Sequence, residues 1–225
     1  MKPILFLDVD GVLNTREWCE ERGLVPKYNA TVEELARWLD PDRIALVDDI
    51  VRQTGALIVL SSATRADPRM GHALYLAGLK APLYSATPIL QHVRHQPLFP
   101  DVARGYPNMV RGRLEWRAAT RAQEIAHWLE HGDVDWKPGD PARQFCILDD
   151  QDGSFSDFYK MDWSWLQIAP ERGLQPEHVP RACTMLTGLS AERHPPDNRC
   201  LYCDSHWSND QREWHSPDCM TNGNP

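Results

Sequence analysis

Three short apolar runs, each followed at once by polar or acidic residues, stand out along the chain. They occupy residues 4–7, 56–60 and 145–148. Each run is continuous rather than alternating with polar residues, which is typical of strands buried on both faces of a parallel sheet. Because such sheets present ligand-binding groups at the carboxyl ends of their strands, we expect the polar residues after these runs to share one edge.

Amphipathic segments with clear start and stop signals lie between these runs. In the best marked of them, Asp40 is placed as an N-cap, Pro41 at the first helical position and Gly55 as the terminator. Residues 31–39 and 120–132 begin with Thr and carry the spacing of a capping box. Weaker patterns predict a helix near 70–79, a strand near 83–85, a final strand near 165 and a helix opened by Pro176.

The order strand, helix, strand is the right-handed crossover unit of a parallel sheet. The sequence therefore predicts an α/β fold, a Rossmann-like, doubly wound parallel sheet, over residues 1–189. Residues 190–225 begin with a polar, proline-bearing linker and are predicted to form a separate small module.

The first apolar run ends in two carboxylates one residue apart, Asp8 and Asp10, followed by Gly11. Two like charges held at a strand end repel each other. A bound cation, a shared proton or both would explain why they stand together. A strand end with two solvated aspartates is the alternative interpretation.

The segment from Asp8 to Val12, Asp-Val-Asp-Gly-Val, resembles the first motif of the haloacid dehalogenase (HAD) superfamily, whose members are mostly magnesium-dependent phosphohydrolases. The resemblance implies that Asp8 attacks phosphorus to form an aspartyl-phosphate, while Asp10 protonates the leaving oxygen and then activates water. The chemistry is reasonable, because a carboxylate nucleophile splits one hard displacement into two easier ones. A second carboxyl nearby supplies acid and base in turn.

Hydroxyl and cationic groups follow at the intervals of the same superfamily. Ser61, first after the second apolar run, matches the Ser or Thr that donates a hydrogen bond to the transferring phosphoryl group. Ser62 and Arg65 are predicted to contact the substrate. Arg65 is predicted to bind phosphate through two hydrogen bonds; the alternative is that it is an ordinary surface arginine. Arg121 takes the place of the lysine that neutralises nucleophile and phosphate in HAD proteins, and Arg117 is its competitor.

The third apolar run ends in Asp149 and Asp150, which match the fourth HAD motif. The resemblance implies that an acid at this point, Asp149 in preference to Asp150, joins Asp8 and the main-chain carbonyl of Asp10 in holding Mg²⁺ through oxygen ligands. Taken together, the motifs resemble the HAD domain of Swiss-army-knife RNA-repair proteins. That resemblance implies phosphatase activity on nucleic-acid ends. In HAD proteins the interval after the first motif can hold a cap over the active site. Residues 15–39 are too short for a large lid, so the resemblance implies only a minimal cap.

The last part of the chain carries two close pairs of soft metal ligands, Cys200 with Cys203 and His215 with Cys219. Eleven residues separate the pairs, a spacing that predicts a tetrahedral structural Zn²⁺ site, with His206 as a competing ligand for His215. So short a segment buries little apolar surface, and metal binding would supply most of its folding free energy. Its acidic residues weigh against strong backbone binding to nucleic acid, so contact with a protein partner is the alternative.

Charge and composition narrow the function classes only in part. The formal charge of −8 over 225 residues argues against indiscriminate binding of nucleic acid. Residues 62–121 nevertheless hold nine Lys or Arg against three Asp or Glu, which fits either a phosphate-bearing ligand or a solvated surface. Neither a membrane-spanning run nor a signal peptide is evident, so we expect a cytoplasmic protein without membrane contact.

The leading hypothesis is a magnesium-dependent phosphatase that acts on a phosphorylated nucleic-acid end or a nucleotide. A small-metabolite phosphatase is the second hypothesis. The third is a binding protein that keeps the HAD scaffold without turnover and recognises its partner through the zinc module. The arginine in place of lysine motivates this hypothesis.

Overall fold

The computed structural model describes residues 2–24, 30–90, 120–132, 144–151 and 164–188. Arg117, the four predicted zinc ligands and His206 lie outside these described residues. So does the predicted module at 190–225. In chain order the helices and strands are β1 Ile4–Leu7, α1 Arg16–Glu21, α2 Val32–Trp38, α3 Pro41–Thr54, β2 Leu57–Leu60, the 3₁₀ helix η1 Ala63–Ala66, α4 Met70–Leu76, β3 Leu83–Ala86, α5 Arg121–His131, β4 Phe145–Asp149, β5 Trp165–Gln167 and α6 His178–Thr187.

The strands form one parallel sheet in the order β3-β2-β1-β4-β5. The first strand lies in the middle, with Leu7 opposite both Leu60 of β2 and Leu148 of β4. This register places the carboxyl ends of β1, β2 and β4 side by side at one edge. The prediction of a parallel α/β sheet from the three apolar runs is confirmed.

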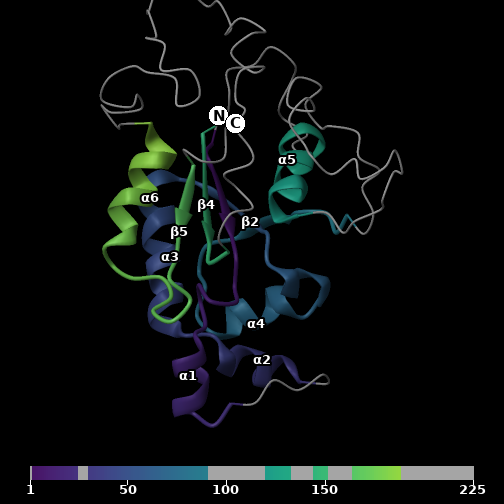
Figure 1. The fold of residues 1–225 in the computed structure, drawn as a ribbon, viewed down its shortest axis with the longest axis vertical. Helices are drawn as coiled ribbons and strands as arrows, with labels where there is room; N and C mark the ends of the chain where they lie inside the picture. The colour runs from purple at the N-terminus through teal and green to yellow at the C-terminus, as the bar shows by residue number, and fades with distance from the viewer. Residues whose placement is uncertain (1, 25–29, 91–119, 133–143, 152–163, 189–225) are drawn as a thin grey trace, which may run out of the picture. The chain divides into compact units, whose positions relative to one another are not determined.

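Helices cover both faces of the sheet, as the doubly wound prediction requires (Figure 1). On one face, Leu5 and Leu7 belong to the same buried cluster as Ile44 and Val47 of α3. On the other face, the Phe6 ring meets Trp128 of α5 edge to face, with ring centroids 5.4 Å apart. Successive side chains of a strand point to opposite faces, so a central strand needs apolar residues at every position.

Local capping signals set the helix boundaries. Thr31 and Thr120 both form complete capping boxes, and Asp40 caps α3 with Pro41 in the first turn, as predicted. The pattern missed α1, which has no buried residue and therefore no apolar stripe to detect. The last helix begins at His178, two residues after the Pro176 that was expected to open it. None of the described helices is long and apolar enough to span a bilayer.

Backbone hydrogen bonds continue past the strand ends and fix the residues that follow them. The Asp8 amide donates to the Leu148 carbonyl at 3.0 Å, and the Ser61 amide donates to the Leu7 carbonyl at 2.9 Å. The Thr87 amide donates in the same way to Leu60 at 2.9 Å. The sheet thus holds the first residues beyond β1, β2 and β3 in defined positions.

The aromatic contact between β1 and α5 yields a stability prediction. Phe6 is fully buried and also meets Phe145 edge to face, with ring centroids 6.0 Å apart. We expect Phe6→Ala to lower the free energy of unfolding by about 3–5 kcal/mol, measured by urea denaturation, because it leaves a cavity between sheet and helix. Ile89→Ala, at a side chain that is 49% exposed, is the control and should change the free energy by less than about 0.5 kcal/mol. Equal effects of the two substitutions would contradict this packing.

Candidate active site

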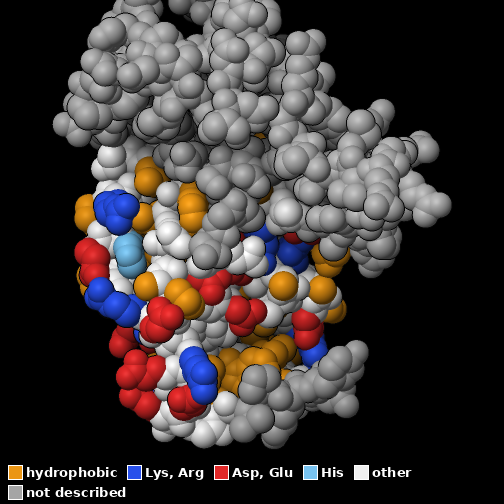
Figure 2. All heavy atoms as spheres, in the orientation of Figure 1, with side chains coloured by type: hydrophobic (Ala, Val, Ile, Leu, Met, Phe, Trp, Pro, Cys, Tyr) orange, Lys and Arg blue, Asp and Glu red, His pale blue; other side chains and the backbone are white. Residues whose placement is uncertain are grey.

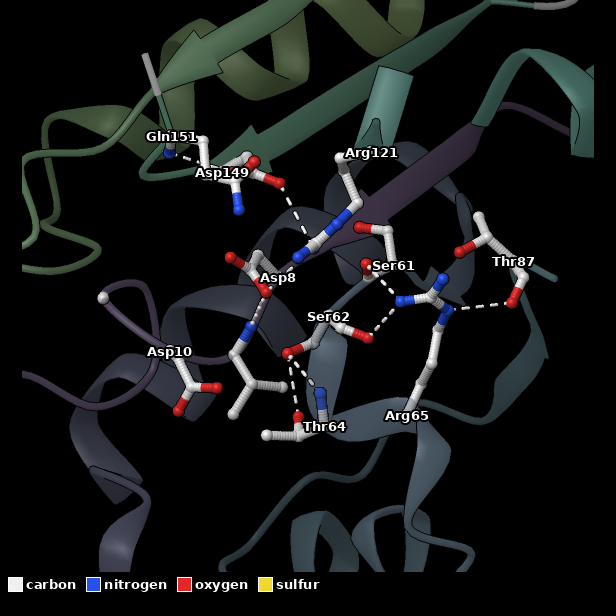
Figure 3. Close-up of polar contacts among 12 residues, drawn as sticks. Asp8, Asp10, Ser61, Ser62, Thr64, Arg65, Thr87, Arg121, Asp149 and Gln151 are labelled. Carbon is white, nitrogen blue, oxygen red and sulfur yellow. Dashed lines mark hydrogen bonds and ion pairs between the residues drawn. The ribbon is translucent and has the colours of Figure 1, made fainter. Parts of the chain in front are cut away.

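Three carboxylates from two strand ends converge at the carboxyl edge of the sheet. Asp8 follows β1, Asp149 ends β4 and Asp150 comes next in the chain, and one oxygen of each lies within 4.8 Å of the others. Asp8 is 3% exposed and Asp149 is fully buried. Figure 3 shows Asp8 and Asp149 facing the same space. The sequence predicted each of these residues, and the fold brings them together.

Arg121 is the cation that meets this cluster. It is the first residue of α5, and its Nη1 donates to Asp8 Oδ1 at 3.1 Å and to Asp149 Oδ2 at 3.3 Å (Figure 3). The amino-terminal end of α5 adds the positive end of its helix dipole. Among the described residues, the Nε and Nη2 groups of Arg121 have no hydrogen-bond partner, so donors remain for an anionic ligand.

Burial and charge repulsion raise the pKa values of Asp149 and Asp150. The pKa of Asp149 rises to about 7, first because burial disfavours its charge and then because Asp8 repels it, against the lowering effect of Arg121. The pKa of Asp150 rises to about 6 for the same two main reasons. Such groups release their protons readily when a cation joins them.

The Asp10 side chain is not a member of the three-carboxylate cluster. It lies at the exposed rim, where Asn14 Nδ2 donates to its Oδ1 at 3.0 Å while the Gly11 amide donates to Asn14 Oδ1 at 3.1 Å. Its pKa is raised, mainly by desolvation and further by the charge of Asp8, against the Asn14 hydrogen bond. Sequence reasoning missed Asn14, although its place four residues after Asp10 in a glycine turn was a usable signal.

Ser61 and Ser62 follow β2 but differ in their contacts. The Oγ of Ser61 is buried and has no hydrogen-bond partner among the described residues. Ser62 instead caps η1, because its Oγ accepts from the amide of Thr64 at 3.3 Å and from the Thr64 hydroxyl at 2.8 Å. A buried hydroxyl without a partner is costly in a folded protein, so the Ser61 hydroxyl is the better placed of the two to meet a ligand.

The position of Arg65 does not fit the predicted contact with phosphate. Its guanidinium is internal, with a side chain only 4% exposed, and it forms an ion pair with Glu124 of α5. It also donates to four main-chain carbonyls, those of Ser61, Ser62, Thr87 and Pro88 (Figure 3 draws the contacts to Ser61, Ser62 and Thr87). All three nitrogens of the guanidinium are therefore occupied by protein groups. Sequence reasoning gave no site role to Glu124 or Thr87, which lie far from Arg65 along the chain.

The described part of the basic excess at 62–121 does not form an open basic face. Of its four described members, Arg65 and Arg121 are internal and paired with carboxylates, Arg69 is paired with Asp67, and Lys80 is exposed. On the face shown in Figure 2, acidic side chains are spread over the middle and lower part of the described surface, with Lys and Arg side chains among them. The remaining arginines of the interval lie outside the described residues.

The donor set at the edge fits a hard divalent cation. Asp8, Asp149 and Asp150 offer carboxylate oxygens close enough to share one ion, and oxygen is the ligand that Mg²⁺ prefers. Burial, and after it the charge of Asp8, raises the pKa values of Asp149 and Asp150, and a bound cation would favour their charged forms. Both the chemistry and the spacing of these groups are therefore compatible with a bound Mg²⁺.

The fold and the site define a class: a parallel α/β protein with a carboxylate centre at the carboxyl edge of its sheet. The family model described as the HAD domain in Swiss Army Knife RNA repair proteins matches residues 4–179. The chain therefore belongs to this family, which is part of the HAD superfamily. Members of HAD families are generally phosphatases or other hydrolases. Neither the curated proteins nor the solved structures gave a significant match.

Gly11 is required where β1 meets the acids after β4. Its φ is +75°, and a Cβ built there would lie 2.6 Å from Cγ of Asp150. We expect Gly11→Ala to displace Asp150 and to weaken Mg²⁺ binding, measured by calorimetry, by about 10- to 100-fold.

Gly55→Ala is the matched control for this substitution. Gly55 has a similar φ of +67° with nothing within 4 Å of its Cβ position. Both variants carry the left-handed strain of about 1–2 kcal/mol, but only Gly11→Ala should lose Mg²⁺ affinity. Equal Mg²⁺ affinities in the two variants would refute the role assigned to Gly11.

The raised pKa of Asp149 makes the stability of the metal-free protein depend on pH. A carboxyl whose folded pKa is about 7 instead of 3.8 stabilises the fold at low pH, and this contribution is lost as the pH rises towards 7. In the presence of EDTA, we expect Asp149→Asn to raise the melting temperature relative to wild type at about pH 8 and to change it much less at about pH 5.

The control for the pH experiment is Asp49→Asn, at an exposed acid of α3 that pairs with Arg52. It should show no such difference between the two pH values. A change in melting temperature for Asp149→Asn that is the same at both pH values would contradict a raised pKa at this position.

Proposed function

We propose that the protein is a magnesium-dependent phosphohydrolase that works through an aspartyl-phosphate on Asp8. The observation that carries this proposal is the meeting of Asp8, Asp149 and Asp150 beside the Arg121 guanidinium. Three acids and one cation leave an excess of negative charge, which a divalent cation would balance. Membership of the HAD family supports the same chemistry.

In the first half of the proposed reaction, a carboxylate oxygen of Asp8 attacks phosphorus and the bond to the leaving oxygen breaks. Oδ1 of Asp8 accepts hydrogen bonds from the Val9 amide at 2.8 Å and from Arg121. Among the described residues Oδ2 accepts none, so it is the oxygen that is free to react. Asp10, with its raised pKa, donates a proton to the leaving oxygen.

In the second half, Asp10 takes a proton from water, the water oxygen attacks phosphorus, and phosphate leaves as the Asp8 carboxylate is restored. Arg121 balances the charge of the transferring group, and the Ser61 hydroxyl donates a hydrogen bond to it. Mg²⁺, held by Asp8, Asp149 or Asp150 and the Asp10 carbonyl, would supply charge neutralisation at the phosphoryl oxygens.

The proposed substrate is a phosphorylated nucleic-acid end or a nucleotide. The family description, which names RNA repair, supports this choice. The interval between β1 and α3 also supports it, because the helices described there, α1 and α2, have only six and seven residues. Such short helices form at most a small cap, and a small cap leaves room for a polymer. The zinc site at Cys200, Cys203, His215 and Cys219 stays a prediction, as does its use for a protein partner.

Replacing the two motif aspartates tests the assigned chemistry. We expect Asp8→Asn to lower kcat by about 10⁴-fold or more, because it removes the nucleophile. Asp10→Asn should lower kcat by about 10²- to 10⁴-fold, because it removes the proton donor and acceptor. Phosphate release in Mg²⁺ measures both effects, with Asp49→Asn on α3 as an exposed control that should keep its activity. Wild-type rates in the Asp8 variant would overturn the mechanism.

The substrate class is tested by a separate comparison. Phosphate release is measured from 3′- and 5′-phosphorylated RNA and DNA oligonucleotides, free nucleotides and sugar phosphates at equal concentration. We expect the highest kcat/KM for an oligonucleotide end or a nucleotide. Activity confined to sugar phosphates would favour a small-metabolite phosphatase, and inactivity on every ester would favour a binding protein on the HAD scaffold.

A further inference from the structure

We propose that Arg65 and Glu124 form a positioning pair that aims Arg121 at Asp8 and Asp149. This inference rests on the proposed function, because it concerns the same reaction. Neither residue of the pair touches the carboxylate cluster, so each acts through another group. Its basis is a set of hydrogen bonds that connects the residues after β2 and β3 to α5.

The pair is buried, and its geometry is specific. The side chains of Arg65 and Glu124 are only 4% and 9% exposed, and Arg65 Nη2 donates to Glu124 Oε2. The second Glu124 oxygen accepts from the Leu90 amide at 3.2 Å. A buried ion pair in which both partners hold further hydrogen bonds has one favoured arrangement, because any other leaves a charge without a partner.

Arg65 also connects the ends of two strands. Its Nη1 donates to the Ser61 carbonyl at 3.2 Å and to the Ser62 carbonyl at 2.6 Å, while its Nε donates to the Thr87 carbonyl at 2.9 Å. The residues after β2 and β3 are therefore fixed by one planar guanidinium. Ser61 is thereby held at its carbonyl, and its hydroxyl has no hydrogen-bond partner among the described residues.

Glu124 connects the buried ion pair to α5. It lies three residues after Arg121, so the two side chains project from the same side of the helix, one turn apart. With Glu124 held by Arg65 and Leu90, α5 can neither rotate nor slide without breaking the buried pair. Arg121 consequently leaves the first turn of α5 in the direction of Asp8 and Asp149.

The test is a double-mutant cycle of Arg65→Lys with Arg121→Lys. Lysine keeps the charge of Arg65 but cannot bridge four carbonyls and a carboxylate at once. We expect Arg65→Lys to lower kcat on a phosphate monoester by about 10- to 100-fold with little change in KM, because a small misplacement of Arg121 weakens only the transition state. In the Arg121→Lys background, the same change should cost little further.

Controls separate positioning from a general loss of fold. Rates are expressed per folded molecule, as measured by near-ultraviolet circular dichroism. Glu124→Gln, which keeps the size of the side chain, is the second variant should Arg65→Lys fold poorly, and it should lower kcat in the same way. Arg52→Lys, at an exposed pair on α3, should leave kcat unchanged. Independent, multiplying losses in the cycle, or an unchanged kcat per folded molecule, would overturn the proposal.

A readout without turnover distinguishes this proposal from the proposed function. The guanidinium resonances of Arg121 in a ¹H–¹⁵N spectrum, assigned by their absence in Arg121→Lys, report its ordered ion pairs directly. We expect Arg65→Lys and Glu124→Gln to shift or broaden them, and Arg52→Lys to leave them in place. If no phosphate ester is hydrolysed, the proposed function fails while these shifts still support the positioning pair. Unchanged Arg121 resonances in both variants would overturn it.

Discussion

Repulsion among carboxylates at one sheet edge is the constraint on which the rest of this structure depends. Asp8 and Asp149 are almost completely buried, and Asp150 lies within reach of both. Charges in such surroundings are costly, and the raised pKa values of Asp149 and Asp150 express that cost. Clustered, buried carboxyl groups with raised pKa values are typical of binding and catalytic sites.

Two internal arginines, Arg121 and Arg65, have different roles around these carboxylates. Arg121 offsets the negative charge directly, and because both of its carboxylate contacts use Nη1, other donors remain for a ligand. All three guanidinium nitrogens of Arg65 donate to protein groups, and these bonds connect the residues after β2 and β3 to α5. A lysine in place of Arg121 would meet the carboxylates as a point charge, whereas the planar guanidinium brings donors in fixed directions. In the proposed function, Arg121 in the place of the usual HAD lysine therefore adds donors without removing the cation.

Much of the fold and part of the site follow from local patterns. Continuous apolar runs marked β1, β2 and β4, and capping residues such as Thr120 marked the helix starts. That the acids and hydroxyls after those runs meet at one edge was predictable, because parallel strands end at a common edge. Arg65 was misjudged because nothing in its neighbourhood shows an internal partner 59 residues further along the chain. The helix α1 was missed because it buries no residue.

The sequence by itself determined which elements form and which chemical groups follow each strand, because burial and capping act over a few residues. The tertiary structure alone decided how those groups are used. It joined Asp149 to Asp8 through strand register, left Asp10 at the rim and took Arg65 out of contact with solvent. These outcomes depend on distances between segments far apart in the chain. Such distances are set by how the sheet and α5 pack, and no local pattern encodes them.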